Sequence, residues 1–252
     1  LVQKVSWPAD VRAREGQLHY LEAGAWDVRP LFIGQSRFAA ATFENVSVTA
    51  FVSPDSAGEV FPLVLARARQ SVYVNVYEFT STALAQDLIG AKQRGADVLV
   101  LVDGGPVGGI SPEEQSAIHL MNRSGIPVFA MAAAGETKAP YRFNHAKYAV
   151  IDGQSVLLTS ENFKASGIPP AGRNGNRGWG VYLEDPALAS YFEHVFVSDI
   201  RMRNSVPITG IAGQNESFAG VPYTTEFPPA YFSGARVTPV IAPDSSYLIT
   251  GL

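Results

Sequence analysis

The sequence predicts an α/β fold, because strand-like and helix-like patterns alternate along most of the chain. Segments of alternating apolar residues are separated by amphipathic segments, which is the pattern of a layered sheet flanked by helices. The segment 97–103 holds consecutive Val and Leu residues between two acids, as expected of a strand covered on both faces. With 252 residues, 46% of them hydrophobic and 17% charged, the chain can bury a substantial core.

Local patterns predict each element in turn. Apolar patterns predict strands over 46–52, 71–79, 97–103, 126–131, 155–158 and 179–183, with a further strand at residue 147. Helical spacing predicts helices within 60–69, 82–94, 111–125 and 185–198. Ser111 is expected to be the N-cap of the third helix, with Glu114 as its capping-box partner. Gly95 and Gly125 are expected to end the second and third helices.

These patterns divide the chain into four parts. Residues 1–45 are predicted to be an extended or β connector, or the tail of an upstream domain. Residues 46–200 are predicted to form the compact module. Residues 201–236 contain Gly, Pro, Asn and Ser with little periodicity and are predicted to be a linker. Residues 237–252 are predicted to begin a second module.

The last of these predictions comes from a repeat. Residues 237–245 match residues 48–56 at five of nine positions, ending in Pro-Asp-Ser in both copies. Because the earlier copy begins the predicted module, the later copy indicates that a second module begins there. We therefore expect the chain to be a fragment or processed form of a tandem two-module protein. The alternative is a coincidence of two Pro-Asp strand exits.

The polar residues that suggest chemistry gather around the strand at residue 147. His145, Lys147 and Asp152 form the pattern H-x-K-x4-D, and Thr159-Ser160-Glu161-Asn162 follows it. Residues two apart on a strand point to the same face. His145 and Lys147 are therefore predicted to present an imidazole and an ammonium side by side, which suits attack on phosphorus and binding of charged oxygens.

These residues resemble the signature of the phospholipase D superfamily, and the resemblance extends over roughly 46–200. It implies a phospholipase D-like layered mixed sheet flanked by helices on both faces. It implies that His145 is the nucleophile and forms a phosphohistidine. Lys147 and Asn162 would hold the non-bridging oxygens, and Ser160 would add a hydroxyl. Asp152, beyond the strand end, would be structural or orienting, and the scheme needs neither metal nor cofactor.

Two positions depart from the family pattern. Thr159 stands where the family usually has Gly, which an extended backbone would tolerate. Gly178 stands where the family usually has the acid that orients the imidazole. An imidazole attacks well when its other ring nitrogen is held by an acceptor. We therefore expect Glu78, at the end of a predicted strand, to replace the missing acid as part of the site.

The resemblance also implies a partner. In this family two H-x-K motifs meet at one pseudo-twofold site, where one imidazole attacks and the other protonates the leaving oxygen. This chain has one motif. The second motif is therefore expected from another copy in a homodimer or from a missing tandem module.

Composition limits the substrate only loosely. The net charge of −4 and the pI near 5.6 disfavour a strongly basic nucleic-acid binder. Basic residues cluster around the motif and are interpreted equally well as a phosphate-binding mouth or as solvated charges: Lys138, Arg142, Lys147, Lys164, Arg173 and Arg177. The substrate is predicted to be a phosphodiester, either nucleic acid or phospholipid. The alternative is a catalytically weakened module that binds phosphate or acts as a scaffold.

The cellular compartment stays open. The chain has no cysteine, which excludes disulfides and cysteine-based zinc sites. No apolar run is long enough to predict a transmembrane segment. We expect a soluble protein, and the sequence leaves open whether it is exported or displayed on the cell surface.

Overall fold

The computed structural model describes residues 17–22, 25–30, 38, 40–132, 141–218 and 220–245. The chain divides into two compact units. One consists of Phe43–Val237, and the other of Leu1–Thr42 together with Thr238–Leu252. In the second unit, β1 (Gln17–Glu22) and β2 (Ala25–Pro30) form a two-stranded antiparallel sheet.

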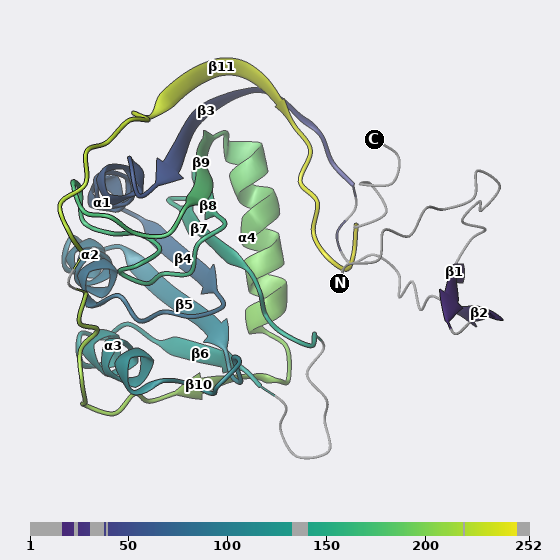
Figure 1. Ribbon diagram of the computed structural model, residues 1–252, viewed down its shortest axis with the longest axis horizontal. Helices are drawn as coiled ribbons and strands as arrows, with labels where there is room; N and C mark the ends of the chain where they lie inside the picture. The colour runs from purple at the N-terminus through teal and green to yellow at the C-terminus, as the bar shows by residue number, and fades with distance from the viewer. Residues whose placement is uncertain are drawn as a thin grey trace. The chain divides into compact units, whose positions relative to one another are not determined.

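The larger unit is built around one mixed sheet of nine strands in the order β10-β6-β5-β4-β7-β8-β9-β3-β11 (Figure 1). Its strands are β3 (Phe43–Ser53), β4 (Ser71–Val76), β5 (Asp97–Asp103), β6 (Val128–Met131), β7 (Lys147–Ile151), β8 (Ser155–Thr159), β9 (Gly178–Glu184), β10 (Ser205–Ile208) and β11 (Ala230–Val237). Strands β4, β5 and β6 are parallel, and the other pairs are antiparallel.

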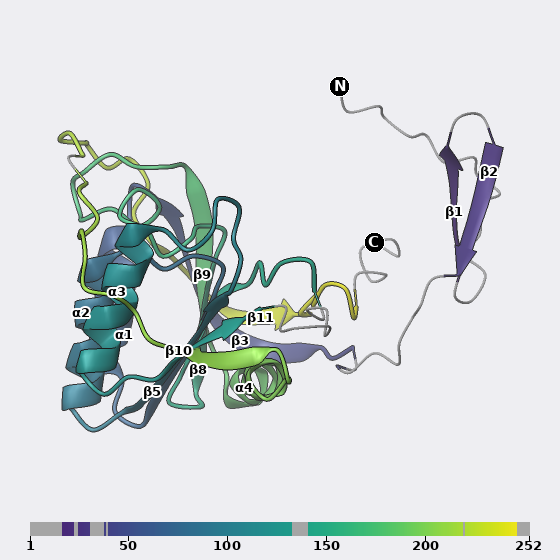
Figure 2. The same ribbon diagram turned by 90° about the horizontal axis from the view of Figure 1, so that it is seen from below.

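Helices cover both faces of this sheet. They are α1 (Ala57–Arg67), α2 (Thr82–Gln93), α3 (Pro112–Arg123) and α4 (Pro186–Ile200). Figure 2 shows α1, α2 and α3 on one face and α4 on the other. The predicted layered mixed sheet with helices on both faces is therefore confirmed. None of the helices in the described part of the chain is long and apolar enough to cross a membrane.

The parallel strands bring polar residues to one edge of the sheet. Helices α2 and α3 connect β4 to β5 and β5 to β6, so these three strands run in the same direction. Gly95 and Gly125 follow the two helices with φ of 99° and 78°, a backbone conformation that glycine adopts at little cost. The carboxyl ends of the strands, where Glu78 and Asp103 lie, consequently meet at one edge.

The segment expected to be a linker is partly built into the sheet. Within 201–236, β10 pairs with β6 and β11 pairs with β3. Residues 209–218 and 220–229, called the strap, run past α3, α2 and α1 to β11 (Figure 1). The strap is tied down by polar contacts, for example from Gly210 N to Asn122 Oδ1 at 3.0 Å. Composition predicted the irregular backbone but not these anchoring bonds.

A cluster of phenylalanines joins the helices to the turn that follows the motif. The ring of Phe61 on α1 lies 5.8 Å from that of Phe51 on β3 and 5.4 Å from that of Phe163, in edge contacts. Phe163 also contacts Phe79, with 5.5 Å between ring centroids. All four side chains are buried. Because Phe163 follows Asn162 directly, burial of this ring fixes the end of the Thr159–Asn162 turn.

We predict that Phe61→Ala will lower the free energy of unfolding by about 3–5 kcal/mol, because it removes a buried ring and leaves a cavity. Leu63→Ala on the same helix is the control. Leu63 is 48% exposed, so its truncation should cost about 0.5 kcal/mol or less. Denaturant unfolding of both variants checks this, and equal losses would contradict the proposed core.

Candidate active site

The H-x-K segment lies beside the end of β4. Lys147 begins β7 and pairs with Val76, and Tyr77 N donates to Ala146 O at 2.9 Å. His145 lies just before β7 rather than within it. Its ring centroid is 4.8 Å from that of Tyr77, and Lys147 Nζ is 5.4 Å from the same ring. The imidazole and the ammonium therefore share one aromatic platform.

The electrostatic surroundings favour a neutral imidazole. His145 is exposed overall, yet partial burial and then the ammonium of Lys147 lower its pKa. The carboxylates of Asp103 and Glu78 oppose that lowering of the pKa. A neutral imidazole at neutral pH has a free lone pair for attack.

The charge of Lys147 is supported by acids. Burial lowers the pKa of Lys147, while the carboxylates of Glu161 and then Glu78 raise it. Lys147 Nζ donates to His145 O at 3.2 Å. This bond to the backbone of His145 holds the ammonium next to the imidazole. The positive charge of Lys147 therefore lies where an anionic ligand would bind.

Glu78 organises the residues that follow the motif. Its carboxylate accepts from Asn162 Nδ2 at 2.7 Å and from Lys164 Nζ at 3.1 Å. The backbone N–H of Phe163 donates to Glu78 O at 3.1 Å. Within the described part of the chain, neither ring nitrogen of His145 has a hydrogen-bond partner. Glu78 therefore contacts the predicted site through its hydrogen bond to Asn162. It acts on His145 only through the electrostatic effect of its carboxylate.

Thr159 and Ser160 fasten the turn to β9. Thr159 is the last residue of β8 and pairs with Gly180, so its backbone is extended and its Cβ is accommodated. The Thr159 hydroxyl donates to Trp179 O at 3.2 Å. Ser160 Oγ accepts from Trp179 N at 3.0 Å. The two hydroxyls therefore fix the turn that presents Asn162.

Asp152 lies at the opposite end of β7 and holds backbone. Its carboxylate accepts from the N–H groups of Arg69, Gln70 and Ser71, at distances between 2.7 and 3.1 Å. These bonds attach the β7–β8 turn to the segment that enters β4. Asp152 therefore sets how β4 and β7 lie against each other, as a structural residue would.

Glu161 occupies the space above Gly178. A Cβ built on Gly178 would lie 2.4 Å from Cγ and 2.6 Å from Oε1 of Glu161. Glu161 Oε2 accepts from Asn176 Nδ2 at 3.1 Å. A side chain at residue 178 and the observed Glu161 conformation exclude each other. The volume next to Gly178 therefore holds the carboxylate of Glu161.

Sequence reasoning missed two acids behind the site. Asp103, the last residue of β5, accepts from Asn144 N at 2.6 Å and so positions the residue before His145. Glu114 is fully buried and accepts from Phe79 N at 2.9 Å. Ser111 caps α3 by accepting from Glu114 N, as expected. The Glu114 carboxylate, however, accepts from Phe79 N. This bond takes the place of the one from the backbone N–H of Ser111 that a full capping box would contain.

The sequence contains a signal for one of these two acids but not for the other. Asp103 could have been selected because functional groups gather at the carboxyl ends of parallel strands. Glu114 gave no such signal, because a capping box explained it locally. Only the contact between α3 and the end of β4 shows that its side chain faces the interior.

Three of the five clustered basic residues that the structure describes are engaged by acids or by a backbone carbonyl. Lys164 pairs with Glu78, and Arg177 donates to the buried Asp55 at 2.6 Å. Arg173 donates to a backbone carbonyl of the strap at 3.1 Å. Lys138 lies outside the described residues. Arg142 is exposed, with its guanidinium carbon 5.8 Å from the centroid of the Phe143 ring. Among the described residues, these contacts favour solvated or structural charges over a broad basic mouth, and Lys147 shares the Tyr77 ring with the imidazole.

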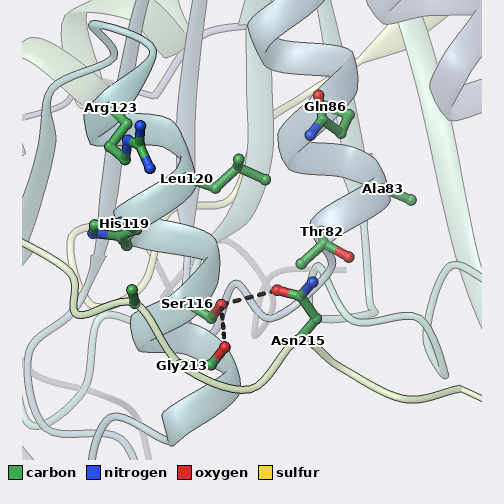
Figure 3. A pocket seen from close by; sticks show the side chains of 10 residues that line it. Thr82, Ala83, Gln86, Ser116, His119, Leu120, Arg123, Gly213 and Asn215 are labelled. Atoms are coloured by element: carbon green, nitrogen blue, oxygen red, sulfur yellow. Dashed lines mark hydrogen bonds between the residues drawn. The ribbon is translucent and has the colours of Figure 1, made fainter.

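A separate surface pocket lies between α2, α3 and the strap (Figure 3). It has a volume of about 440 Å³ and includes Ser116, His119 and Arg123 in its lining. No H-x-K residue lines it. Within the described ranges, no three His, Asp or Glu side chains are grouped as a metal site would require. The H-x-K segment and the Thr159–Asn162 turn therefore remain the candidate active site.

Known proteins share this part of the chain. Residues 64–200 match the family described as "Cardiolipin synthase, PLD-like domain". Proteins named phospholipase D from Rickettsia bellii and Rickettsia felis are each 27% identical to the chain over 147 residues, which is 58% of this chain. The matches span 65% and 66% of those two relatives, slightly under two thirds of their length.

Two solved structures share the fold. Nuc from Salmonella typhimurium, described as a phospholipase D family member, has a TM-score of 0.56 and 23% identity, over 66% of this chain and 99% of its own. NucT from Helicobacter pylori has a TM-score of 0.54 and 17% identity, over 65% of this chain and 99% of its own.

We predict that Glu114 makes stability depend on pH. Burial is the main cause that raises the pKa of Glu114 from 4.5 to about 7. The folded state thus favours the protonated acid, so stability should fall as pH rises from about 4.5 to about 7. Glu114→Gln should remove this loss and be more stable than the parent above pH 7, by up to about 3 kcal/mol.

Denaturant unfolding across pH 4 to 8 measures this difference. Glu113→Gln, on the same helix and partly exposed, is the matched control and should follow the parent. Parallel curves for Glu114→Gln and the parent would refute the proposed protonation.

Proposed function

This chain belongs to the PLD-like domain family, whose members are phosphodiesterase-type enzymes, and from that premise we propose that it cleaves phosphodiester bonds with His145 as nucleophile. The observation that supports this most directly is the shared platform on Tyr77. An imidazole with a lowered pKa and an ammonium lie next to each other there. Such a pair combines a nucleophile with a cation that can stabilise the charge gained by phosphorus oxygens.

The first step forms a phosphohistidine. A ring nitrogen of His145 forms a bond to phosphorus as the bond from phosphorus to the leaving oxygen breaks. Lys147 and Asn162 hold the non-bridging oxygens. Glu78 binds Asn162 and thereby positions it. The leaving oxygen takes its proton from a second imidazole, which a second H-x-K module supplies as general acid.

The second step releases the enzyme. Water attacks phosphorus, the bond from phosphorus to His145 breaks, and the second imidazole accepts the proton of the water. The imidazole of His145 then leaves as a neutral ring, so the cycle restores both groups. An alcohol in place of water would transfer the phosphoryl group instead. None of these steps uses a metal ion.

The substrate class is a phosphodiester of nucleic acid or phospholipid. The exposure of His145, and the engagement of Lys164, Arg173 and Arg177 by other parts of the described chain, fit a substrate recognised around one phosphate. A second candidate function is phosphate binding without turnover. It is favoured by the lack of an acceptor on the His145 ring among the described residues, because an unoriented imidazole attacks poorly.

We predict that His145→Ala will abolish hydrolysis of bis(p-nitrophenyl) phosphate in excess EDTA, with a loss of at least about 1,000-fold. The assay should contain the second H-x-K module, since the general acid comes from it. His119→Ala, which removes an imidazole from the surface pocket, is the matched control and should keep full activity. Activity in the His145→Ala protein would disprove the nucleophile, and phosphate binding with no turnover in the parent would favour the second candidate function.

We predict a role for Glu161 in the pH profile of this reaction. The Glu161 carboxylate raises the pKa of Lys147, and the reaction needs Lys147 protonated. Glu161→Gln should therefore shift the alkaline fall in kcat/KM to lower pH. Glu184→Gln, at the far end of β9, is the control and should leave the profile unchanged. An unshifted alkaline limb in Glu161→Gln would refute this role.

A further inference from the structure

The repeat seen in the sequence is also a repeat in structure. At the same offset of 189 residues, the match extends upstream to include Phe43 and Phe232. Residues 41–56 contain β3 and the turn after it, and residues 230–245 contain β11 and its following turn. The later segment therefore corresponds to the strand on which the first module begins.

The two turns are closed by the same hydrogen bonds. Ser56 N donates to Val52 O at 2.8 Å, and Val52 N donates to Ser56 Oγ at 3.2 Å. In the second copy, Ser245 N donates to Ile241 O at 2.7 Å, and Ile241 N donates to Ser245 Oγ at 2.7 Å. The two turns thus form the same side-chain and backbone hydrogen bonds at corresponding positions. This agreement argues against a chance resemblance between the two segments.

The strands share an irregularity as well. Asn45 has a φ of 61°, and its counterpart Gly234 has a φ of 70°. Few non-glycine residues adopt such angles. A positive φ at the same point of both strands indicates that both copies have one backbone design.

β3 and β11 pair with each other as symmetric equivalents would. Phe43 pairs with Val237, which is the counterpart of Val48. Val48 in turn pairs with Phe232, which is the counterpart of Phe43. Exchanging the two strands therefore reproduces the same pairs, which is the property of an antiparallel pair on a two-fold axis.

The axis passes close to Val46 and Ala235. These residues are counterparts of each other and are paired, and the register is irregular on both sides of Ala235. One further contact fits the same symmetry: Thr42 Oγ1 lies 2.8 Å from Oγ1 of Thr238, the counterpart of Thr49. Exchanging the two copies converts this contact into one between Thr49 and Tyr231. These two residues are also paired in the sheet.

The second copy differs in what covers it. Phe43 packs on Tyr191 of α4 with 5.9 Å between ring centroids, and Phe51 is buried against α1. Phe232, the counterpart of Phe43, is 57% exposed on β11. An aromatic side chain exposed on an edge strand marks an interaction surface. Helices of a second module would cover this surface.

We propose that residues 230–245 are the leading strand and turn of a second PLD-like module, continued by the same polypeptide, which docks on the first about the two-fold axis at Val46 and Ala235. β11 of this chain covers the edge of β3, so a second copy of the chain cannot use that edge without exchanging strands. The proposal rests on the proposed function only for the chemistry of the partner module, which supplies the second imidazole.

The first test uses the protein translated from the whole reading frame. It should contain a second H-x-K motif about 190 residues after His145, at the offset of the strand repeat. Phe232→Ala should lower the unfolding temperature of this protein by about 5 °C or more, because the ring is buried there. In the 252-residue chain the same change should be silent, whereas Phe43→Ala should destabilise both proteins. A frame without a second motif, or a silent Phe232→Ala in both proteins, would overturn the proposal.

The second test separates one polypeptide from two. The chain has no cysteine, so Thr42→Cys with Thr238→Cys introduces a single possible disulfide, and Thr49→Cys with Tyr231→Cys introduces its symmetric equivalent. Oxidation should give an intrachain bond in a monomer for either pair. Cross-linked dimers would show that a second copy occupies the edge, and failure of both pairs in folded protein would refute the register. Neither test measures hydrolysis, so an inactive protein that passes both would contradict only the proposed function.

Discussion

The site depends on the backbone at the end of β4. Residues 77–79 bond on one side to the H-x-K segment, through Tyr77 N and Ala146 O, and on the other to the turn, through Phe163 N and Glu78 O. The side chains follow this arrangement, because Tyr77 supports the imidazole and Glu78 binds Asn162. Three separate stretches of sequence therefore meet on one short strand end. The buried acids Asp103 and Glu114 hold that strand end from behind.

The sequence was sufficient to predict the parts of the fold that are governed by local patterns. The strand alternation of 71–79, the glycine stops and the helix caps all depend on neighbours in the chain. The positions of His145 and Lys147 were predicted as a pair on one strand, whereas the structure has His145 just before it. What local patterns could not supply was pairing between distant segments, such as the strap bonds to Asn122 and the addition of β11 to β3.

The same distinction applies within the candidate site. Asn162 and Ser160 could be found because they follow the motif at fixed spacing. Glu78 was proposed to orient His145, but its carboxylate binds Asn162 and Lys164, and this choice depends on where a turn from another hairpin lies. The role of Glu114 was equally hidden, since Ser111 offered a sufficient local explanation. Side-chain partners that lie 35 to 86 residues apart depend on the register of the sheet, which composition does not encode.

Glu161 and Gly178 share one volume, so the choice of residue at one position constrains the side chain at the other. An acid restored at residue 178 would meet the Glu161 side chain, and a smaller residue at 161 alone would leave the space without a carboxylate. A position-by-position comparison would therefore score residue 178 as a lost acid, although negative charge is still present in that volume. An engineered acid at residue 178 consequently requires the Glu161 side chain to leave its observed conformation or to be replaced.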